Sequence, residues 1–320
     1  MDMAQRAMGR VSPAVTRSKL ALELAAELVG MDGWPHVRAQ ILLKTQDFDP
    51  SGFSLYGSGQ PDGIEQVARG ESQLAIINPS AVLTMAHRGT GFFERALDVR
   101  AITVLPSYDQ IAFAVTEATG LRSLADVASQ RYPLRVSIRG PRENSVPQLA
   151  NVVFRAYGFT LDDIDAWGGK VTYDRRLPAG RLEQIESGAA DALFDEAVHQ
   201  WVDRAADLGM RFFDVDDDTM RKLGELGLRR GVVAHAVHPR LPADVQSVDF
   251  SGFPLFTRAD VPEAEIRAVC AALEARRDRI PWEGQGPMPL DQMCRDTTEG
   301  PLDVPLHPAA QAYWREAGYL

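Results

Sequence analysis

The chain has 320 residues, of which 45% are hydrophobic and 24% charged, a composition typical of a soluble globular protein of about two domains. Its 34 Lys and Arg residues against 44 Asp and Glu residues give a net charge of −10, which repels phosphate backbones and argues against a nucleic-acid partner. Cys270 and Cys294 form no CxxC pair, so they indicate neither a zinc site nor a disulfide framework.

No segment has the pattern of an export signal or of a membrane helix. A secretory signal needs a basic start and roughly 7–15 uninterrupted apolar residues. The best candidate, Leu20 to Val29, is interrupted by Glu23 and Glu27. No stretch approaches the roughly 18 apolar residues of a membrane span. The sequence therefore predicts a soluble chain without a visible export address.

The first half of the chain follows the order strand, loop, helix, strand, which is typical of parallel sheets. It begins with a predicted helix that Ser18 caps and Gly30 ends, with Leu20, Leu24 and Leu28 on one face. The predicted elements that follow are a strand at 37–45, a loop at 54–63, a helix around 64–68, and strands at 74–77, 101–105 and 111–115.

The second half repeats this order. A strand at 134–138 leads through the loop RGPRENSVP into a helix at 148–157, with Ser145 at the N-cap and Pro147 in the first turn. The remaining predicted elements are a helix at 182–187, a strand at 191–194, a helix at 199–208, a strand at 211–215, an extended segment at 247–257 and a helix at 262–277. Because strand-like crossings fall near 105 and 248, we expect residues 1–104 with 248–320 to form one lobe and residues 105–247 the other.

Five segments, in order along the chain, resemble the TAXI solute receptors of TRAP transporters, a branch of the type II periplasmic binding-protein superfamily. PLHPAAQAYWREAGYL, from Pro305 to Leu320, resembles the proline-leucine-histidine-proline turn and terminal helix of that family. The other four segments are YGSGQPDGIEQVARGESQLAII, LPSYDQIAFAV, ESGAADALF and VDFSGFPLFTRADVPEAEIRAVCAALE. The resemblance implies a two-lobed α/β fold with a ligand cleft between the lobes, no cofactor, a periplasmic location and a membrane TRAP permease as partner.

The sequence departs from the family pattern in two places. The family begins with a strand and a Gly-rich turn, for which MDMAQRAMGRVSPAVTR supplies only Gly9. The loop RGPRENSVP carries more charge than the Gly- and Ser-rich second-lobe loop of the family. We therefore expect a more highly charged pocket and a different ligand.

In an open α/β sheet, ligands bind beyond the carboxyl ends of the strands, where helix N-termini favour anions. Polar loop residues occupy several such positions. The candidate ligand-binding residues are Tyr56, Gly57, Ser58, Gly59, Asn78, Ser80, Tyr108, Arg139, Arg142, Asn144, Ser145, Asp195 and Glu196. Arg139 or Arg142 could fork onto a carboxylate, so the sequence predicts a small organic anion as the ligand.

Each candidate segment also has a purely structural interpretation. The glycines beside Tyr56 suit a loop that needs positive φ. The residues 78–80 suit a helix N-cap, and Asp195 with Glu196 suits a capping pair before the next helix. Tyr108 suits a turn between strands, and most arginines in polar loops are solvated. The sequence leaves both interpretations open.

The run DVDDD superficially matches a calcium loop through Asp214, Asp216, Asp218 and Glu225. Thr219 stands where that loop needs Gly, and Arg221 stands where it needs an apolar residue. We therefore expect no metal site, and we expect Asp218 to cap the helix that follows.

The histidines and the familiar catalytic motifs give no enzyme signature. His235 and His238 are three residues apart in a predicted extended segment, which sends them to opposite faces. His307 belongs to the C-terminal turn, so we expect it to have a structural role. The chain contains no G-x-S-x-G elbow, no P-loop and no G-x-G-x-x-G.

The sequence therefore predicts a binding module whose lobes close by a hinge over one small carboxylate, without catalytic residues. The alternative is a cytoplasmic enzyme, for example decarboxylase-like or hydrolase-like, or a ligand sensor on the same fold. The charged RGPREN loop and the missing signal motivate that alternative, with Asp195, Glu196 or His199 as candidate acid or base.

Overall fold

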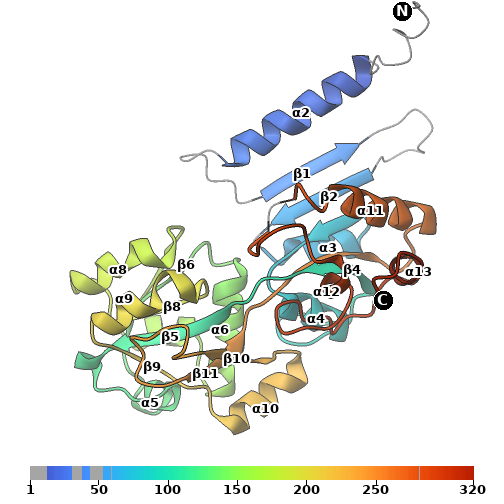
Figure 1. The fold of residues 1–320 in the computed structure, drawn as a ribbon. Helices are drawn as coiled ribbons and strands as arrows, with labels where there is room; N and C mark the ends of the chain where they lie inside the picture. The colour runs from blue at the N-terminus through green and yellow to red at the C-terminus, as the bar shows by residue number, and fades with distance from the viewer. Residues whose placement is uncertain (1–12, 31–37, 44–52, 59, 281) are drawn as a thin grey trace, which may run out of the picture. The chain divides into compact units, whose positions relative to one another are not determined.

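The computed structural model describes residues 13–30, 38–43, 53–58, 60–280 and 282–320 (Figure 1). The chain divides into two units, Met1–Ala39 and Gln40–Leu320. In the first unit, α2 (Pro13–Gly30) confirms the predicted N-terminal helix, which begins five residues before Ser18. Residues 1–12, with Gly9, and the candidate ligand residue Gly59 lie outside the described residues.

The first sheet of the second unit has the strand order β1-β2-β3-β12-β4. β2 runs parallel to β3, whereas β12 is antiparallel to both of its neighbours. Its strands are β1 (Arg38–Leu43), β2 (Phe53–Ser58), β3 (Leu74–Ile76), β4 (Val99–Leu105) and β12 (Phe253–Arg258). The accompanying helices are α3 (Asp62–Ala68), α4 (Ser80–Arg88), α11 (Glu263–Arg276), α12 (Leu290–Met293) and α13 (Pro308–Glu316).

Alternation along the strands of the first sheet supplies two hydrophobic layers. On β3, Ala75 packs into the layer that contains Ile64 of α3 and Val82 of α4. The neighbouring Leu74 packs into the opposite layer with Ile266 of α11. Helices therefore cover both faces of the sheet at β3, whereas Leu42 and Leu43 of the edge strand β1 are exposed.

The second sheet has the strand order β10-β11-β5-β8-β6-β7, and β9 also pairs with β5. Its strands are β5 (Gln110–Thr116), β6 (Arg135–Arg139), β7 (Lys170–Asp174), β8 (Ala192–Asp195), β9 (Met210–Phe212), β10 (Arg230–Val233) and β11 (Val245–Asp249). Its helices are η1 (Glu117–Thr119), α5 (Leu124–Gln130), α6 (Ser145–Ala156), α7 (Leu161–Ala166), α8 (Pro178–Glu186), η2 (Val198–Gln200), α9 (Val202–Asp207) and α10 (Asp217–Leu226).

The central strand β5 is buried on both faces. Phe113 packs on one face against Phe154 of α6 and Phe194 of β8, with ring centroids 5.4 and 5.6 Å apart. Ala112 and Ala114 point to the other face, into the layer that contains Trp201. The near-continuous apolar run IAFAV therefore reflects helices on both sides of the strand.

Two chain crossings join the sheets, one from β4 to β5 and one from β11 to β12, and they are hydrogen-bonded to each other. The Phe250 amide donates to the Asp109 carbonyl at 2.8 Å, and the Gly252 amide donates to the Ser107 carbonyl at 3.0 Å. Gly252 has φ +82°, a left-handed conformation that favours glycine. The predicted mixed α/β fold class is confirmed by these two sheets.

Several local predictions need correction. The segment 54–63 is not all loop, because β2 reaches Ser58 and pairs with β3, and α3 begins at Asp62. Asn144, not Ser145, caps α6 by accepting a hydrogen bond from the Val146 amide. Asp216, not Asp218, caps α10 in the same way. In each helix the residue just outside the first turn reaches a free N–H, which a residue inside the turn does not.

The extended segment predicted at 247–257 is divided into β11 and β12 by the second crossing. The segment that holds His235 and His238 forms turns after β10 and is not an extended strand. No helix among the described residues combines the length and the apolar character that crossing a membrane requires.

Candidate functional site

Four charged side chains meet where β6 and β8 end, and we call them the charge cluster: Arg139, Arg181, Asp195 and Glu196. Arg139 is the last residue of β6, and its Nε lies 3.2 Å from Asp195 Oδ1. Its Nη1 lies 2.5 Å from Glu196 Oε1. Arg181 of α8 pairs with the same Asp195 from the other side. Adjacent parallel strands deliver their C-terminal residues to one edge, so the sheet topology itself builds this cluster.

Arg181 is fully buried beneath the cluster. Its Nε donates to the Arg176 carbonyl at 3.0 Å, and its Nη1 donates to Ser137 Oγ at 3.2 Å. Burial, together with the positive charge of Arg139, lowers the pKa of Arg181 to about 9. Arg181 therefore stays protonated at neutral pH and supports the buried carboxylate of Asp195.

Glu196 is an acid whose surroundings favour the protonated form. Burial raises the pKa of Glu196 to about 8, against the opposing effect of Arg139. A hydrogen bond with Asp109 and the negative charges of Asp109 and Glu283 raise that pKa further. Ala197, the next residue, has φ 54°, a backbone conformation that is strained for a residue with a Cβ. The backbone conformation that follows Glu196 therefore costs conformational free energy, which the rest of the fold offsets.

Arg139 has spare hydrogen-bonding capacity. Its side chain is 18% exposed. Its Nη2 is buried and has no hydrogen-bond partner among the described residues. A guanidinium binds a carboxylate best through two neighbouring donors. Arg139 therefore combines a positive charge, an unused donor and partial access to solvent.

A second group of acids ties the cluster to the chain crossings. The Asp109 carboxylate accepts hydrogen bonds from the Ala197 amide at 2.7 Å and from the Val198 amide at 3.2 Å. Ser251 on the other crossing donates to Asp249 at 2.6 Å. Burial raises the pKa of Asp249 to about 6. Asp109 therefore links the first crossing to Ala197 and Val198, the two residues that follow Glu196.

The candidate ligand-binding residues of the first sheet are uncharged. Several of them already make contacts or hydrogen bonds within the protein. Tyr56 is buried, its ring packs against Gly63, and its hydroxyl donates to Asp62 at 2.9 Å. Asn78 donates to the carbonyl of Gly252 on the second crossing at 3.2 Å. Ser80 begins α4, and its buried Oγ has no hydrogen-bond partner among the described residues. Gly57 and Ser58 end β2 next to these residues.

The remaining candidates of the second sheet are dispersed. Arg142 is 52% exposed, pairs with Asp162 and donates to the Tyr173 hydroxyl at 3.1 Å. Asn144 is occupied by capping α6, and Ser145 is buried in its first turn. The structure therefore brings Arg139, Asp195 and Glu196 together, and it leaves Arg142 in a separate surface ion pair.

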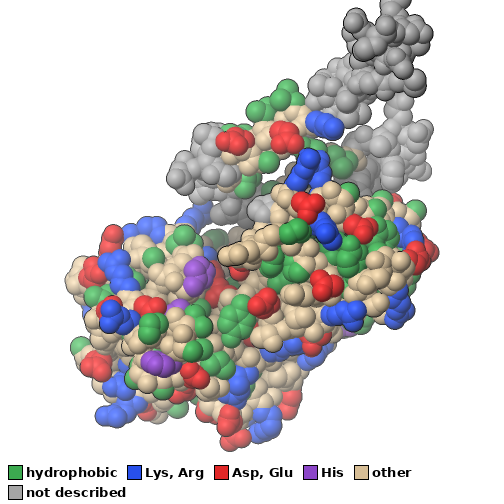
Figure 2. Space-filling model, viewed as in Figure 1, with side chains coloured by type: hydrophobic (Ala, Val, Ile, Leu, Met, Phe, Trp, Pro, Cys, Tyr) green, Lys and Arg blue, Asp and Glu red, His purple; other side chains and the backbone are tan. Residues whose placement is uncertain are grey.

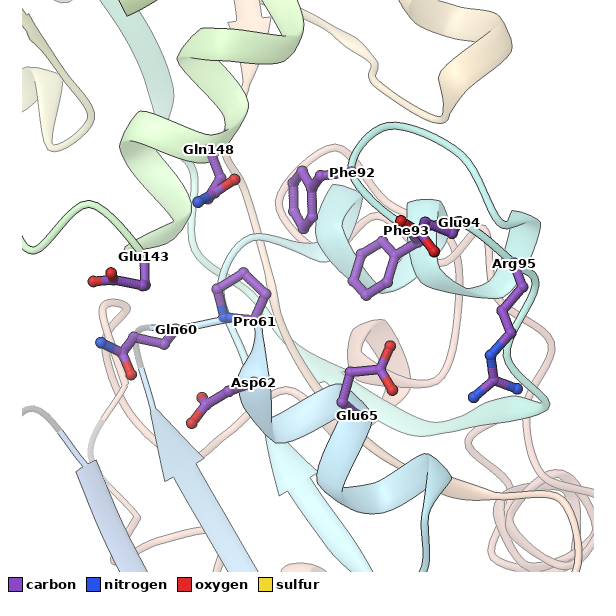
Figure 3. Close-up of a pocket in the computed structure, with 10 residues that line it drawn as sticks. All are labelled: Gln60, Pro61, Asp62, Glu65, Phe92, Phe93, Glu94, Arg95, Glu143 and Gln148. Atoms are coloured by element: carbon purple, nitrogen blue, oxygen red, sulfur yellow. The ribbon is translucent and has the colours of Figure 1, made fainter. Parts of the chain in front are cut away.

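A cavity of about 440 Å³, which we call the interlobe pocket, lies between the start of α3 and the start of α6 (Figure 3). Figure 3 shows Gln60, Pro61 and Asp62 on one side and Glu143 and Gln148 on the other. The loop after α4 closes the pocket with Phe92, Phe93, Glu94 and Arg95. Aromatic surface surrounded by polar groups suits a small organic solute.

A second cavity, of about 460 Å³, lies at the first crossing, and we call it the hinge pocket. Tyr108 lines it and is largely exposed, with His199, Trp282, Glu283 and Glu299 around it. Burial and the charges of Asp249 and Glu299 raise the pKa of Tyr108. Because Glu283 also acts on Glu196, this pocket borders the charge cluster.

Three residues of the site were missed by sequence reasoning: Arg181, Asp109 and Asp249. Arg181 had a detectable signal, because it shares the 178–182–185 face of α8 with the apolar Pro178, Leu182 and Ile185. An arginine on an apolar helix face points to a buried partner. Asp109 and Asp249 lie at the ends of apolar strands. No sequence pattern indicates that Ser251 connects them.

Metal binding has no support among the described residues, where no group of His, Cys, Asp and Glu side chains has the arrangement that could hold an ion. His307 caps α13, as its Nδ1 accepts a hydrogen bond from the Ala309 amide at 3.2 Å. The histidine of the C-terminal turn therefore has the structural role expected of it.

Positive and negative side chains are interspersed on the face of residues 40–320 that Figure 2 shows. The charge cluster at the ends of β6 and β8 is, by contrast, largely buried. Two sheets joined by two crossings, with a charged site at the ends of β6 and β8, define a mixed α/β protein of two layered halves. The chain belongs to the NMT1-like family, which matches residues 50–318.

The solved structures that this chain resembles include three solute-binding proteins. The alkanesulfonate-binding protein SsuA from Xanthomonas axonopodis pv. citri is 15% identical, with 68% of this chain and 62% of that chain covered and a TM-score of 0.32. An ancestral arginine-binding protein is 13% identical, with 68% and 72% covered and a TM-score of 0.33. The aliphatic sulphonate-binding protein SsuA from Escherichia coli is 16% identical, with 67% and 55% covered and a TM-score of 0.32. The match thus spans less than two-thirds of either sulfonate-binding protein.

Proposed function

We propose that this protein is a solute-binding receptor whose two lobes close on a small organic anion, with a carboxylate held by Arg139. The observation that supports this most strongly is the charge cluster at the junction of the two sheets, where Arg139 has an unused buried donor. A guanidinium with a free donor in a partly shielded site favours an oxyanion over a neutral group.

The lobes in this proposal are residues 1–104 with 248–320 and residues 105–247. Only the two crossings connect their sheets covalently, and such paired crossings act as a hinge in proteins that close over a ligand. The interlobe pocket is lined from both sides of that hinge, so closure would bury a ligand between α3 and α6. The neutral groups Gly57, Asn78 and Ser80 then complete the first-lobe wall.

The setting we propose is the periplasm, with a membrane permease of the TRAP type as the partner that receives the solute. Membership of the NMT1-like family and the TAXI-like segments of the sequence support this setting. No cofactor is part of the proposal, because binding in the micromolar range requires only about 8 kcal/mol. A few charge-assisted hydrogen bonds and the desolvation of the cleft can supply that free energy.

A second candidate function is an enzyme or a ligand sensor that uses the charge cluster as its acid or base. The raised pKa of Glu196, about 8, favours this alternative because perturbed acids gather at catalytic sites. His199 lines the adjacent hinge pocket and could relay a proton. Turnover of a bound solute, followed by mass spectrometry of the released compound, would support this alternative and count against a receptor.

The proposed function is tested by titration calorimetry with four classes of solute: mono- and dicarboxylates, sulfonates, amino acids and neutral sugars. We expect a carboxylate to bind most tightly, in the micromolar range or below, and to be recovered unchanged. Tighter binding of neutral or cationic solutes would contradict the carboxylate assignment. Failure of every class to bind would contradict the receptor function itself.

A further inference from the structure

Glu196 already occupies the position that a ligand carboxylate would need. Its Oε1 lies 2.5 Å from Arg139 Nη1, while the adjacent Nη2 of the same guanidinium has no hydrogen-bond partner among the described residues. A carboxylate that binds the fork of a guanidinium uses two neighbouring donors. With Glu196 in place, an incoming anion finds one donor available and the other taken.

We propose that ionised Glu196 is an internal stand-in for the ligand carboxylate: an anionic solute displaces it from Arg139, and Glu196 takes up one proton from solvent as that ion pair breaks. Where Glu196 is already protonated, it yields its place at Arg139 without proton uptake. This inference rests on the proposed function, because it describes how the same site exchanges one carboxylate for another. It adds that binding is linked to a proton, which the receptor function alone does not require.

The cost of a net charge in the buried cluster is the physical reason for this proton uptake. Arg139 and Arg181 contribute +2, and ionised Asp195 and Glu196 contribute −2, so the cluster is neutral. A ligand carboxylate added to this set would leave a net charge of −1 in a largely buried site, which is costly. Protonation of Glu196 restores neutrality, since the proton becomes bound to its carboxyl oxygen and no other bond changes.

The groups that face Glu196 allow this protonation. Arg139 at the end of β6 favours the ionised form, and Asp109 from the first crossing and Glu283 from the chain before α12 favour the protonated form. Arg181 of α8 acts from beneath the cluster. Once a ligand occupies Arg139, Arg139 no longer stabilises ionised Glu196. Asp109 and Glu283 still favour the protonated form of Glu196. A protonated Glu196 can donate to Asp109 and stay satisfied.

The direction of the pH dependence follows from these neighbours. In the free protein the pKa of Glu196 is about 8, so below that pH Glu196 is already neutral and does not compete for Arg139. Above it, the ionised Glu196 must be displaced and protonated before an anion binds. Affinity for a carboxylate should therefore be constant near pH 7 and fall by about fourfold between pH 7 and pH 8.5.

The test is calorimetry of wild type and Glu196→Gln with the tightest-binding carboxylate of the panel, at pH 7 and pH 8.5, in two amine buffers of different protonation enthalpy. At pH 8.5 we expect wild type to take up about 0.7 of a proton per ligand bound. Glu196→Gln should take up less than about 0.2 of a proton, and its dissociation constant should change less than about twofold between the two pH values. Glu183→Gln, an exposed glutamate of α8, is the matched control and should behave as wild type.

Four outcomes are possible, and each decides the matter. Proton uptake in wild type that disappears in Glu196→Gln supports the inference. Proton uptake that persists in Glu196→Gln overturns the inference, because another group then takes up the proton. Carboxylate binding to wild type without proton uptake at pH 8.5 overturns it and leaves the receptor function standing, whether or not the variant folds. If no carboxylate binds wild type at either pH, the proposed function fails and the inference fails with it.

Discussion

The two sheets supply polar groups to their junction in different ways. The first sheet offers neutral groups that the fold largely employs, as when Tyr56 bonds Asp62 and Asn78 bonds the second crossing. The second sheet offers charges, Arg139 and Glu196, supported from beneath by the buried Arg181. The charged groups of the candidate site therefore come from the second sheet, and the first sheet supplies neutral groups.

This difference has an energetic consequence. Buried charges must be paired, so each member of the charge cluster depends on its partners for its place in the fold. Neutral groups such as the Ser80 hydroxyl carry no such requirement. We therefore expect substitutions at the end of the second sheet to affect both stability and binding, whereas removal of the unpartnered Ser80 hydroxyl of the first sheet should have a small effect on stability.

The largest expected effect belongs to Arg181→Met, which removes a buried guanidinium and keeps much of its volume. Leaving the buried Asp195 without this partner should lower the free energy of unfolding by about 3–5 kcal/mol, measured by urea denaturation. Arg240→Met, at an exposed arginine that pairs with Asp207, should cost less than about 1 kcal/mol.

A double variant separates charge from packing in that experiment. Arg181→Met combined with Asp195→Asn removes both buried charges, so it should regain part of the lost stability. If the double variant is no more stable than the single one, lost packing and not an unpaired carboxylate explains the effect.

The smallest expected effect belongs to Ser80→Ala on the first sheet. The Ser80 hydroxyl is buried without a hydrogen-bond partner among the described residues, so its removal should change the free energy of unfolding by less than about 1 kcal/mol and could raise it. Thermal denaturation with circular dichroism measures this. A loss above about 2 kcal/mol would show that the first sheet also depends on polar contacts at this edge.

The fold was largely predictable from sequence because its strands and helices have strong apolar patterns. The strands at β4, β5 and β6 and the helix α11 fall where periodicity placed them. The error at β2 arose because SLYGS contains turn-forming residues, and its pairing with β3 is a long-range contact that local propensity does not encode. The caps of α6 and α10 lie one and two residues before the predicted positions. Several neighbouring side chains can reach the same free N–H, so the sequence does not fix which one caps the helix.

The site was only partly predictable. Arg139, Asp195 and Glu196 were identified because strand ends and helix N-termini mark the ligand edge of a parallel sheet. The sequence did not distinguish Arg139 from Arg142, since both lie in the predicted loop RGPRENSVP, whereas in the structure Arg139 ends β6. Only the structure separates them, with Arg139 against two buried acids and Arg142 in an exposed pair with Asp162. Which of the two binds the ligand stays a prediction.

The most direct test of the account compares the dissociation constants of wild type, Arg139→Ala and Arg142→Ala for the tightest-binding carboxylate, measured by calorimetry at pH 7. Loss of a charged hydrogen bond should weaken Arg139→Ala by about 1.5–3 kcal/mol, which is roughly 10- to 150-fold. Arg139→Lys should restore only part, because an ammonium lacks the planar fork. Arg142→Ala should bind within about fivefold of wild type. Wild-type affinity in Arg139→Ala would contradict the claim that the charge cluster holds the anion.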